Sequence, residues 1–131
     1  MKEFKYLKIF LYLVALHSFI VGVNLLYFSS DLLQSFGFSA LNEPFFKFQG
    51  GVFHLVMVVA YSLAAVNPVK NKMIVIFSII AKFMATIFLL VYYSFYDTSF
   101  IVLLSGISDL IMGVIIYYLY VTATIKNQPE D

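Results

Sequence analysis

Four ionisable side chains lie near the middle of four separate apolar stretches of this 131-residue sequence. They are His17, His54, Lys82 and Asp109. Counted from the stretch ends at about 1.5 Å per residue, three of them fall within about one helical turn of the midplane, and His54 lies slightly nearer one side. Such side chains inside a membrane are candidates for ligand binding, proton exchange or ion pairing, because placing them in hydrocarbon is costly.

Two uncharged polar residues accompany the histidines. Asn24 follows His17 by a spacing that puts both on one side of a helix. Gln49 precedes His54 in the second stretch, next to a pair of glycines. The candidate ligand-binding residues are therefore His17, Asn24, Gln49, His54, Lys82 and Asp109.

The sequence also predicts an ion pair between Lys82 and Asp109. A charged residue at a helix centre costs about 2.5–3.5 kcal/mol on insertion scales, so neither side chain is expected to face lipid. A short turn joins the two helices that carry them, which makes the pairing geometrically easy. The pair either takes part in a function or only sets the register of the helices, since buried ion pairs contribute little net stability. The same two interpretations apply to each histidine.

More specific chemistries find little support. Together, His17 and His54 could ligate a haem iron, but each helix offers only one His and the two differ in depth. No metal site is expected, because the chain has no Cys and no E-x-x-H motif. We interpret Ser105 and Ser108 as small packing residues, since no G-x-S-x-G elbow marks a nucleophile. The cofactor, if one exists, is not identified by these patterns.

The composition places these residues in an integral membrane protein. Hydrophobic types make up 63% of the chain and charged types 11%, against about 25% charged residues in soluble domains. A net charge of +1 argues against a nucleic-acid partner. Stretches of about 20 apolar residues are long enough to cross ~30 Å of hydrocarbon as helices. They cover residues 6–28, 46–65, 73–94 and 99–121.

We therefore expect an all-α fold, a single transmembrane domain over residues 1–131 that forms a four-helix bundle in the lipid bilayer. The short turns near 67–68 and 96–98 predict that the second helix neighbours the third, and the third neighbours the fourth. The longer connection, 29–45, predicts a Ser-capped short helix that ends near Gly37 and lies at the membrane interface. Its apolar side chains are Leu32, Leu33, Phe36 and Phe38.

Lysines predict the orientation of the chain. One side of the membrane would carry only Lys47. The other would carry Lys2, Lys5, Lys8, Lys70, Lys72 and Lys126. Because positively charged loops stay inside, both termini are expected in the cytoplasm. A cleaved signal peptide is disfavoured, since the first apolar stretch continues to Phe28 without an A-x-A-like site.

Several segments resemble small BphX-like membrane proteins of the broader DoxX-like group. They are residues 15–18, 22–26, 43–54 with Ala60-Tyr61, 81–86 and 105–113, in the same order along nearly the whole chain. The resemblance implies a four-helix membrane bundle, expected in a bacterial inner membrane, and no established activity. DoxX itself is associated with quinone-linked sulfur oxidation, which implies a redox or quinone-side role. The chain has no Cys, which argues against a thiol-based version of that role.

Three functions follow from these patterns. The first is binding of an apolar or quinone-like small molecule at the polar layer, in a protein accessory to a redox or catabolic pathway. The second is a structural or accessory subunit without a ligand, in which the polar layer only specifies packing, within an oligomer or beside a partner. The third is a small acid–base enzyme with Lys82 as electrophile and Asp109 or a histidine as base. A cavity that reaches the polar layer would distinguish the first and third from the second.

Overall fold

The computed structural model describes residues 3–35, 37, 44–96 and 98–127. Within these ranges the chain is helical, with turns and no strand. The helices are α1 (Lys5–Tyr27), α2 (Ser30–Ser35), α3 (Pro44–Val66), α4 (Lys72–Phe95) and α5 (Phe100–Lys126). The four predicted long helices are confirmed. Their ends lie within two residues of the predictions except at the end of α5, which continues to Lys126 rather than ending near residue 121.

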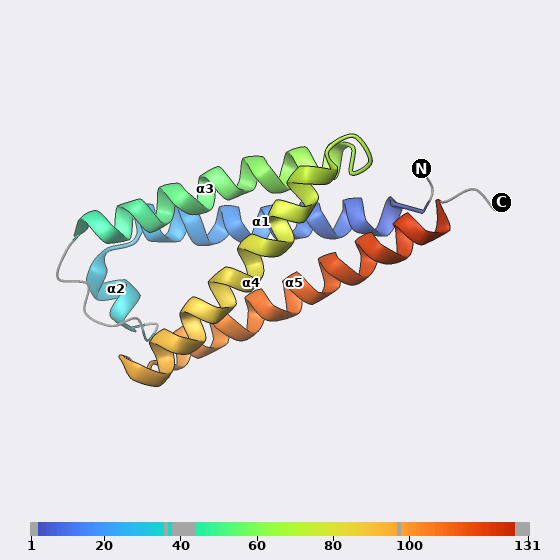
Figure 1. The fold of residues 1–131 in the computed structure, drawn as a ribbon. Coiled ribbons are helices and arrows are strands. Elements are labelled where there is room, and N and C mark those ends of the chain that lie inside the picture. Colours follow the sequence, from blue (N-terminus) through green and yellow to red (C-terminus); the bar gives the residue numbers. More distant parts are fainter. Residues whose placement is uncertain (1–2, 36, 38–43, 97, 128–131) are drawn as a thin grey trace.

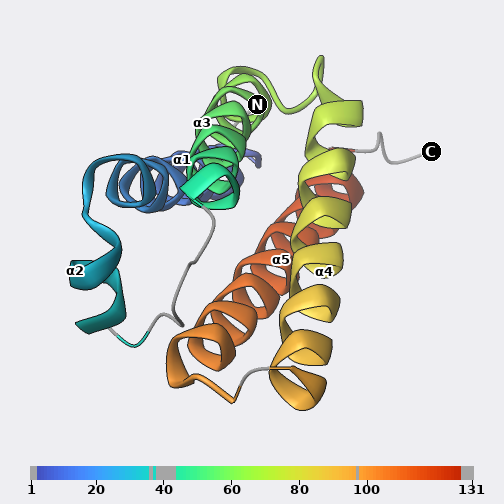
Figure 2. The ribbon, with the colours of Figure 1, turned by 90° about the vertical axis from the view of Figure 1, so that its left-hand side faces the viewer.

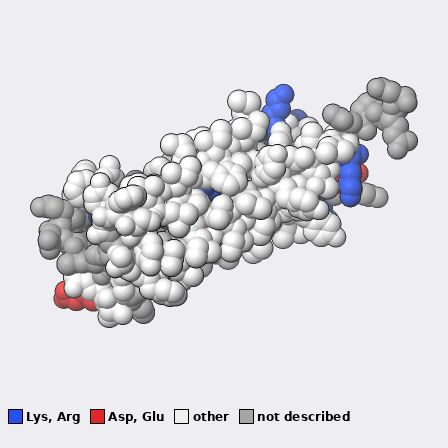
Figure 3. Space-filling model, turned by 60° about the horizontal axis from the view of Figure 1, so that its bottom comes forward, with Lys and Arg blue, Asp and Glu red and all other residues white. Residues whose placement is uncertain are grey.

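The four long helices are built to cross a membrane. They contain 23 to 27 residues, which corresponds to about 35–40 Å at 1.5 Å per residue. Each is long and apolar enough to span a bilayer. Large apolar side chains such as Leu16, Phe53, Ile87 and Val114 are exposed on their outer faces, where lipid tails would cover them. Figure 3 shows the corresponding surface, which is almost free of charge between two charged ends.

The long helices form two antiparallel pairs that converge at one end of the molecule and diverge at the other (Figures 1 and 2). One pair is α1 with α3, and the other is α4 with α5. The start of α1, the end of α5 and the α3–α4 turn lie at the converging end, which we call the narrow end. The short helix α2 lies at the diverging end, which we call the wide end. The bundle is therefore a wedge rather than a closed cylinder.

The apolar core lies at the narrow end. It is made by the first half of α1, the second half of α3, the first half of α4 and the second half of α5, which the topology brings together there. Its deeply buried members include Leu7, Leu11, Val14, Ala64, Ala65, Val75, Ile116 and Ala123. This core closes the narrow end and leaves the space between the two helix pairs at the wide end unfilled by core residues.

Glycines allow α1 and α3 to approach until their backbones touch. A Cβ atom placed on Gly22 would lie 3.0 Å from the carbonyl oxygen of Gly51 and 3.2 Å from the Cβ atom of His54. A Cβ atom on Gly51 would lie 2.7 Å from Cγ of Leu26. The pairing of α1 with α3 across the longest connection was not predicted, whereas the predicted contact of α4 with α5 is confirmed. The helices α3 and α4 also touch, as predicted, but they diverge away from their turn.

Polar contacts connect the segments that meet at the wide end. The hydroxyl of Ser29 accepts a hydrogen bond from the backbone N–H of Leu32 at 3.2 Å and so caps α2. Gly37 follows the helix with a φ angle of 90°, the left-handed conformation that glycine adopts without strain. The hydroxyl of Ser99, just before α5, donates to the carbonyl oxygen of Gly37. These bonds tie the connection after α1 to the start of α5.

The predicted short helix is confirmed as α2, but its apolar side chains differ in position. Leu32 is 40% exposed, as an interfacial residue would be, whereas Leu33 is only 2% exposed and turns into the bundle. Phe36 and Phe38 lie outside the described residues. Nearby, Lys47 on α3 donates from Nζ to the carbonyl oxygen of Phe28 at 2.6 Å. A cation at that position stabilises the C-terminus of α1.

Candidate functional site

The predicted ion pair is present at the boundary between the narrow-end core and the wide end. Nζ of Lys82 on α4 lies 2.5 Å from Oδ1 of Asp109 on α5. The side chain of Lys82 is 5% exposed and that of Asp109 is 16% exposed. Gly113, one turn after Asp109, makes room for the lysine, because a Cβ atom there would lie 3.2 Å from Cβ of Lys82. The pair therefore joins α4 to α5 at the level of the polar layer.

The buried Lys82 contacts an aromatic ring from the other helix pair. Its Nζ lies 5.5 Å from the ring centre of Tyr61 on α3, a residue that is 2% exposed. A cation above the face of an aromatic ring is attracted to it, and the attraction grows when water is excluded. Thr86 donates its hydroxyl hydrogen bond to the backbone carbonyl of Lys82, not to its amine. Lys82 thus links three of the four long helices.

The second histidine is held by the close approach of α1 and α3. Nδ1 of His54 lies 3.4 Å from the hydroxyl oxygen of Ser18. Ser18 is 1% exposed and lies one turn before Gly22, where the helix backbones touch. The small residues on this face of α1 let the imidazole of His54 lie against the helix. The other ring nitrogen of His54, Nε2, can form a further hydrogen bond.

A cavity of about 580 Å³ occupies the wide end between the two helix pairs. Its walls are largely apolar and include Leu25 and Phe28 from α1, Leu33 from α2, and Leu89 and Leu104 from α4 and α5. Polar side chains are also part of its lining. These are His17, Asn24, His54, Ser105, Ser108 and Asp109. The size and the mixture of apolar walls with a few polar groups are typical of small-molecule sites.

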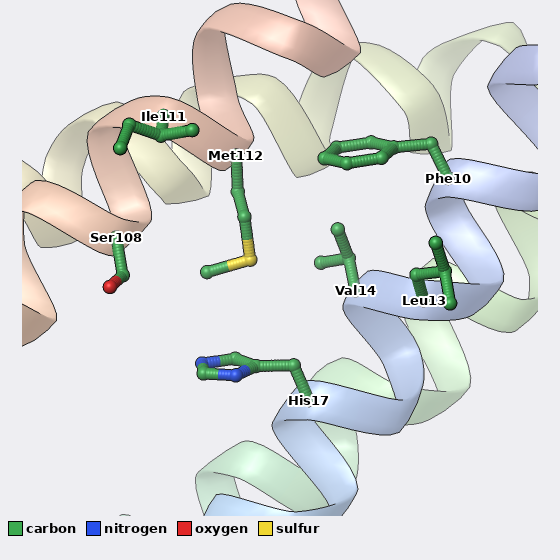
Figure 4. A pocket seen from close by; sticks show the side chains of 7 residues that line it. All are labelled: Phe10, Leu13, Val14, His17, Ser108, Ile111 and Met112. Carbon is green, nitrogen blue, oxygen red and sulfur yellow. The ribbon is translucent and has the colours of Figure 1, made fainter.

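A smaller groove of about 260 Å³ lies between α1 and α5 (Figure 4). The imidazole of His17 extends from α1 toward α5, facing the side chains of Met112 and Ser108. Both His17 and Ser108 also line the larger cavity. Leu13 and Ile111 at the groove are more than half exposed, at 56% and 53%. The groove therefore extends from the exposed outer surface of the bundle to residues that it shares with the cavity.

The structure brings four of the six candidate residues together at the cavity: His17, Asn24, His54 and Asp109. Lys82 is bonded to one of them but is not part of the lining. Gln49 is exposed and also lies outside the lining. Its position five residues before His54 turns it about 140° around α3, away from the cavity.

Two residues that we interpreted as packing residues line the cavity instead. Ser105 and Ser108 are half-buried beside Asp109 and contribute hydroxyl groups to the wall. Ser105 lies one helical turn before Asp109, and Ser108 lies one residue before it. This closeness to Asp109 was the sequence signal that could have identified them. Tyr61 was not among the candidates either, because a tyrosine in an apolar stretch is not distinguishable by pattern from a core aromatic residue.

Within the described residues, no group of three or more His, Asp or Glu side chains could hold a metal ion. Comparison with known proteins adds no assignment: no family model, curated protein or solved structure matches the chain. The likeness to BphX-like proteins stays a prediction based on the segments quoted above. The cavity and its polar wall are therefore the features of this chain that bear on its function.

Proposed function

We propose that this membrane protein binds an apolar or quinone-like molecule in the cavity at the wide end. The observation that carries the proposal is the placement of Asp109, both histidines and Asn24 around one cavity of about 580 Å³ whose other walls are apolar. Such walls favour a hydrophobic ring or tail, and the few polar groups orient a polar end. On the resemblance to the broader DoxX-like group, we place the protein as an accessory to a redox or catabolic pathway.

The groove between α1 and α5 supports a route of access from the bilayer. An apolar ligand partitions into lipid, so a lateral path avoids passage through water. Leu13 and Ile111 at the groove face outward, while His17 and Ser108 are shared with the cavity. We propose that the ligand passes beside His17 as it moves from the lipid to the polar wall.

Filling the cavity tests the proposed function directly. Val21 on α1 lines the cavity, and Val21→Phe adds bulk where the ligand would lie. We expect affinity for a decyl-substituted ring compound, measured by titration of the protein in lipid nanodiscs, to fall at least about tenfold, which corresponds to ~1.4 kcal/mol. Native mass spectrometry of the purified protein would show the matching loss of any copurified small molecule.

The matched control is Val23→Phe, the same change two residues along the same helix. Val23 is 38% exposed and lines neither the cavity nor the groove, so a larger side chain there would contact lipid and not the ligand. Equal affinities for the two variants would contradict binding in this cavity. The absence of binding by the unmodified protein would favour the ligand-free accessory subunit.

The acid–base enzyme is the weaker alternative. It requires Lys82 to reach a substrate as an electrophile, yet this side chain is behind Asp109 and does not line the cavity. Asp109 is the one acidic side chain at the cavity among the described residues. An enzyme of this kind would need a second group to complete the proton transfer, and only the histidines are available.

We also propose that the narrow end faces the cytoplasm. The start of α1, the α3–α4 turn and the end of α5 lie there and carry Lys5, Lys8, Lys70, Lys72 and Lys126, while Lys47 lies near the start of α3 at the wide end. Because the chain has no Cys, single cysteines report position without background. We expect a membrane-impermeant maleimide to label Asp31→Cys on α2 in intact cells, but Val69→Cys in the α3–α4 turn only after permeabilisation. The reverse pattern would place the termini outside.

A further inference from the structure

Only one partner of the ion pair, the acceptor, lines the cavity, and this indicates the chemistry of the ligand. Resting on the proposed function, we infer that the ligand's polar end is a hydrogen-bond donor, an aromatic hydroxyl of the phenol class, that donates to the carboxylate of Asp109. The juxtaposition behind this inference is simple. The acceptor of the pair, Asp109, lines the cavity, while its donor, Lys82, does not.

Lys82 is separated from the cavity by its own partner. The residue is 4% exposed, its Nζ bonds to Oδ1 of Asp109, and the ring of Tyr61 lies 5.5 Å away from the amine. The side chain of Asp109 keeps 16% of its surface exposed. A ligand in the cavity therefore meets the carboxylate and not the ammonium group.

An ionised carboxylate can only accept hydrogen bonds, and its two oxygens offer about four acceptor sites. The bond from Lys82 is to Oδ1, so the carboxylate keeps further acceptor sites, and Asp109 is part of the cavity lining. A ligand that displaces water from this carboxylate without donating to it would leave a charged acceptor unsatisfied, which is unfavourable. A carbonyl group placed there would face one acceptor with another.

The other polar groups of the wall can adapt to either kind of ligand. A neutral imidazole, an amide and a hydroxyl each donate as well as accept, so His54, Asn24 and Ser105 discriminate little between a hydroxyl and a carbonyl. Asp109 is the cavity residue whose role is set, because its carboxylate is the acceptor in the ion pair with Lys82. It is therefore the residue that determines specificity.

The charge balance favours a neutral donor over a cation. Lys82 already compensates the charge of Asp109, so the pair as a whole is neutral. A ligand ammonium group would add an uncompensated positive charge beside Lys82. A phenol supplies a polarised O–H without net charge, and its ring suits the apolar walls formed by Leu25, Phe28 and Leu104.

Three probes with the same tail test the inference on the unmodified protein in lipid nanodiscs. They are 4-decylphenol, which donates; its methyl ether, which has lost the donor; and decyl-1,4-benzoquinone, which only accepts. We expect the phenol to bind at least about tenfold more tightly than the other two, as for loss of a hydrogen bond to a charged group. Equal binding of all three, or tighter binding of the quinone, would overturn the inference and leave the proposed function standing. Failure of every probe to bind would overturn both.

A matched pair of variants locates the preference. Asp109→Asn keeps an oxygen that can accept from Lys82 and places an amide, able to donate, in the wall. We expect the preference for the phenol over the quinone to fall at least about tenfold in this variant. Asp31→Asn makes the same change on the exposed surface of α2, away from the cavity, and should keep the preference. An unaltered preference in a folded Asp109→Asn protein would contradict the assignment, and if that variant does not fold, the probe series alone decides.

Discussion

Replacing Lys82 by Met is expected to lower the free energy of unfolding by about 3–5 kcal/mol, the usual cost of breaking a buried ion pair. The change removes the ammonium group that lies 2.5 Å from Oδ1 of Asp109. The side chain of Asp109, which is only 16% exposed, then has no cation to compensate its charge. Loss of the contact with the Tyr61 ring adds to the cost. The measurement is the midpoint temperature of thermal aggregation of the variant and the unmodified protein in detergent, monitored by size-exclusion chromatography.

The double variant Lys82→Met with Asp109→Leu should recover most of the lost stability. Removing both charges leaves no isolated ion, and an apolar pair of similar size is often as stable as the original pair. Lys70→Met is the control, because Lys70 is exposed in the α3–α4 turn and should change stability by no more than about 0.5 kcal/mol. If the double variant were no more stable than Lys82→Met alone, the two charges would not be acting as partners.

Gly51→Ala should destabilise the pairing of α1 with α3 by about 1–3 kcal/mol, the range for overpacking a tight contact. The new methyl group would lie 2.7 Å from Cγ of Leu26 and 3.1 Å from the carbonyl oxygen of Gly22. Leu26 would have to move, or the two helices would have to separate. Because Gly22 also abuts His54, separation would move that imidazole away from Ser18.

The neighbouring glycine supplies a control in the same helix. A methyl group on Gly50 would lie 3.6 Å from Cδ1 of Leu25, an ordinary contact. Gly50→Ala should therefore be neutral or stabilising by up to about 1 kcal/mol, because alanine favours a helix interior. The comparison is between the melting temperatures of the two variants, measured in the same detergent. Equal midpoints would show that the helices do not meet at Gly51 as described.

The two long-range pairings differ in how far local spacing could predict them. A turn as short as that between α4 and α5 leaves their helices little choice but to lie side by side, so the contact of Lys82 with Asp109 was accessible to prediction. The pairing of α1 with α3 spans the longest connection and depends on the mutual fit of Gly22 and Gly51. Shape complementarity of that kind is not expressed in hydropathy or in residue spacing.

The sequence predicted a polar site inside the membrane, but only some of the residues that line it. Placing His17, His54, Lys82 and Asp109 at one level required only the rise of a helix and the ends of the apolar stretches. Their rotation about the helix axes and the angle between the helix pairs then determined which side chains line the cavity. That is why Asp109 faces the cavity while Lys82 is behind it, and why Gln49 lies outside while Ser105 and Ser108 lie within.

By itself the sequence determined a membrane protein with four long helices and one short one, because length and apolar content act within each segment. It also determined that the lysines gather at one end. Only the tertiary structure decided that the helices form two pairs joined by a core at the narrow end, with an open cavity at the other. The physical reason is that close packing requires complementary surfaces from segments far apart in the chain, and those surfaces exist only once the helices have come together.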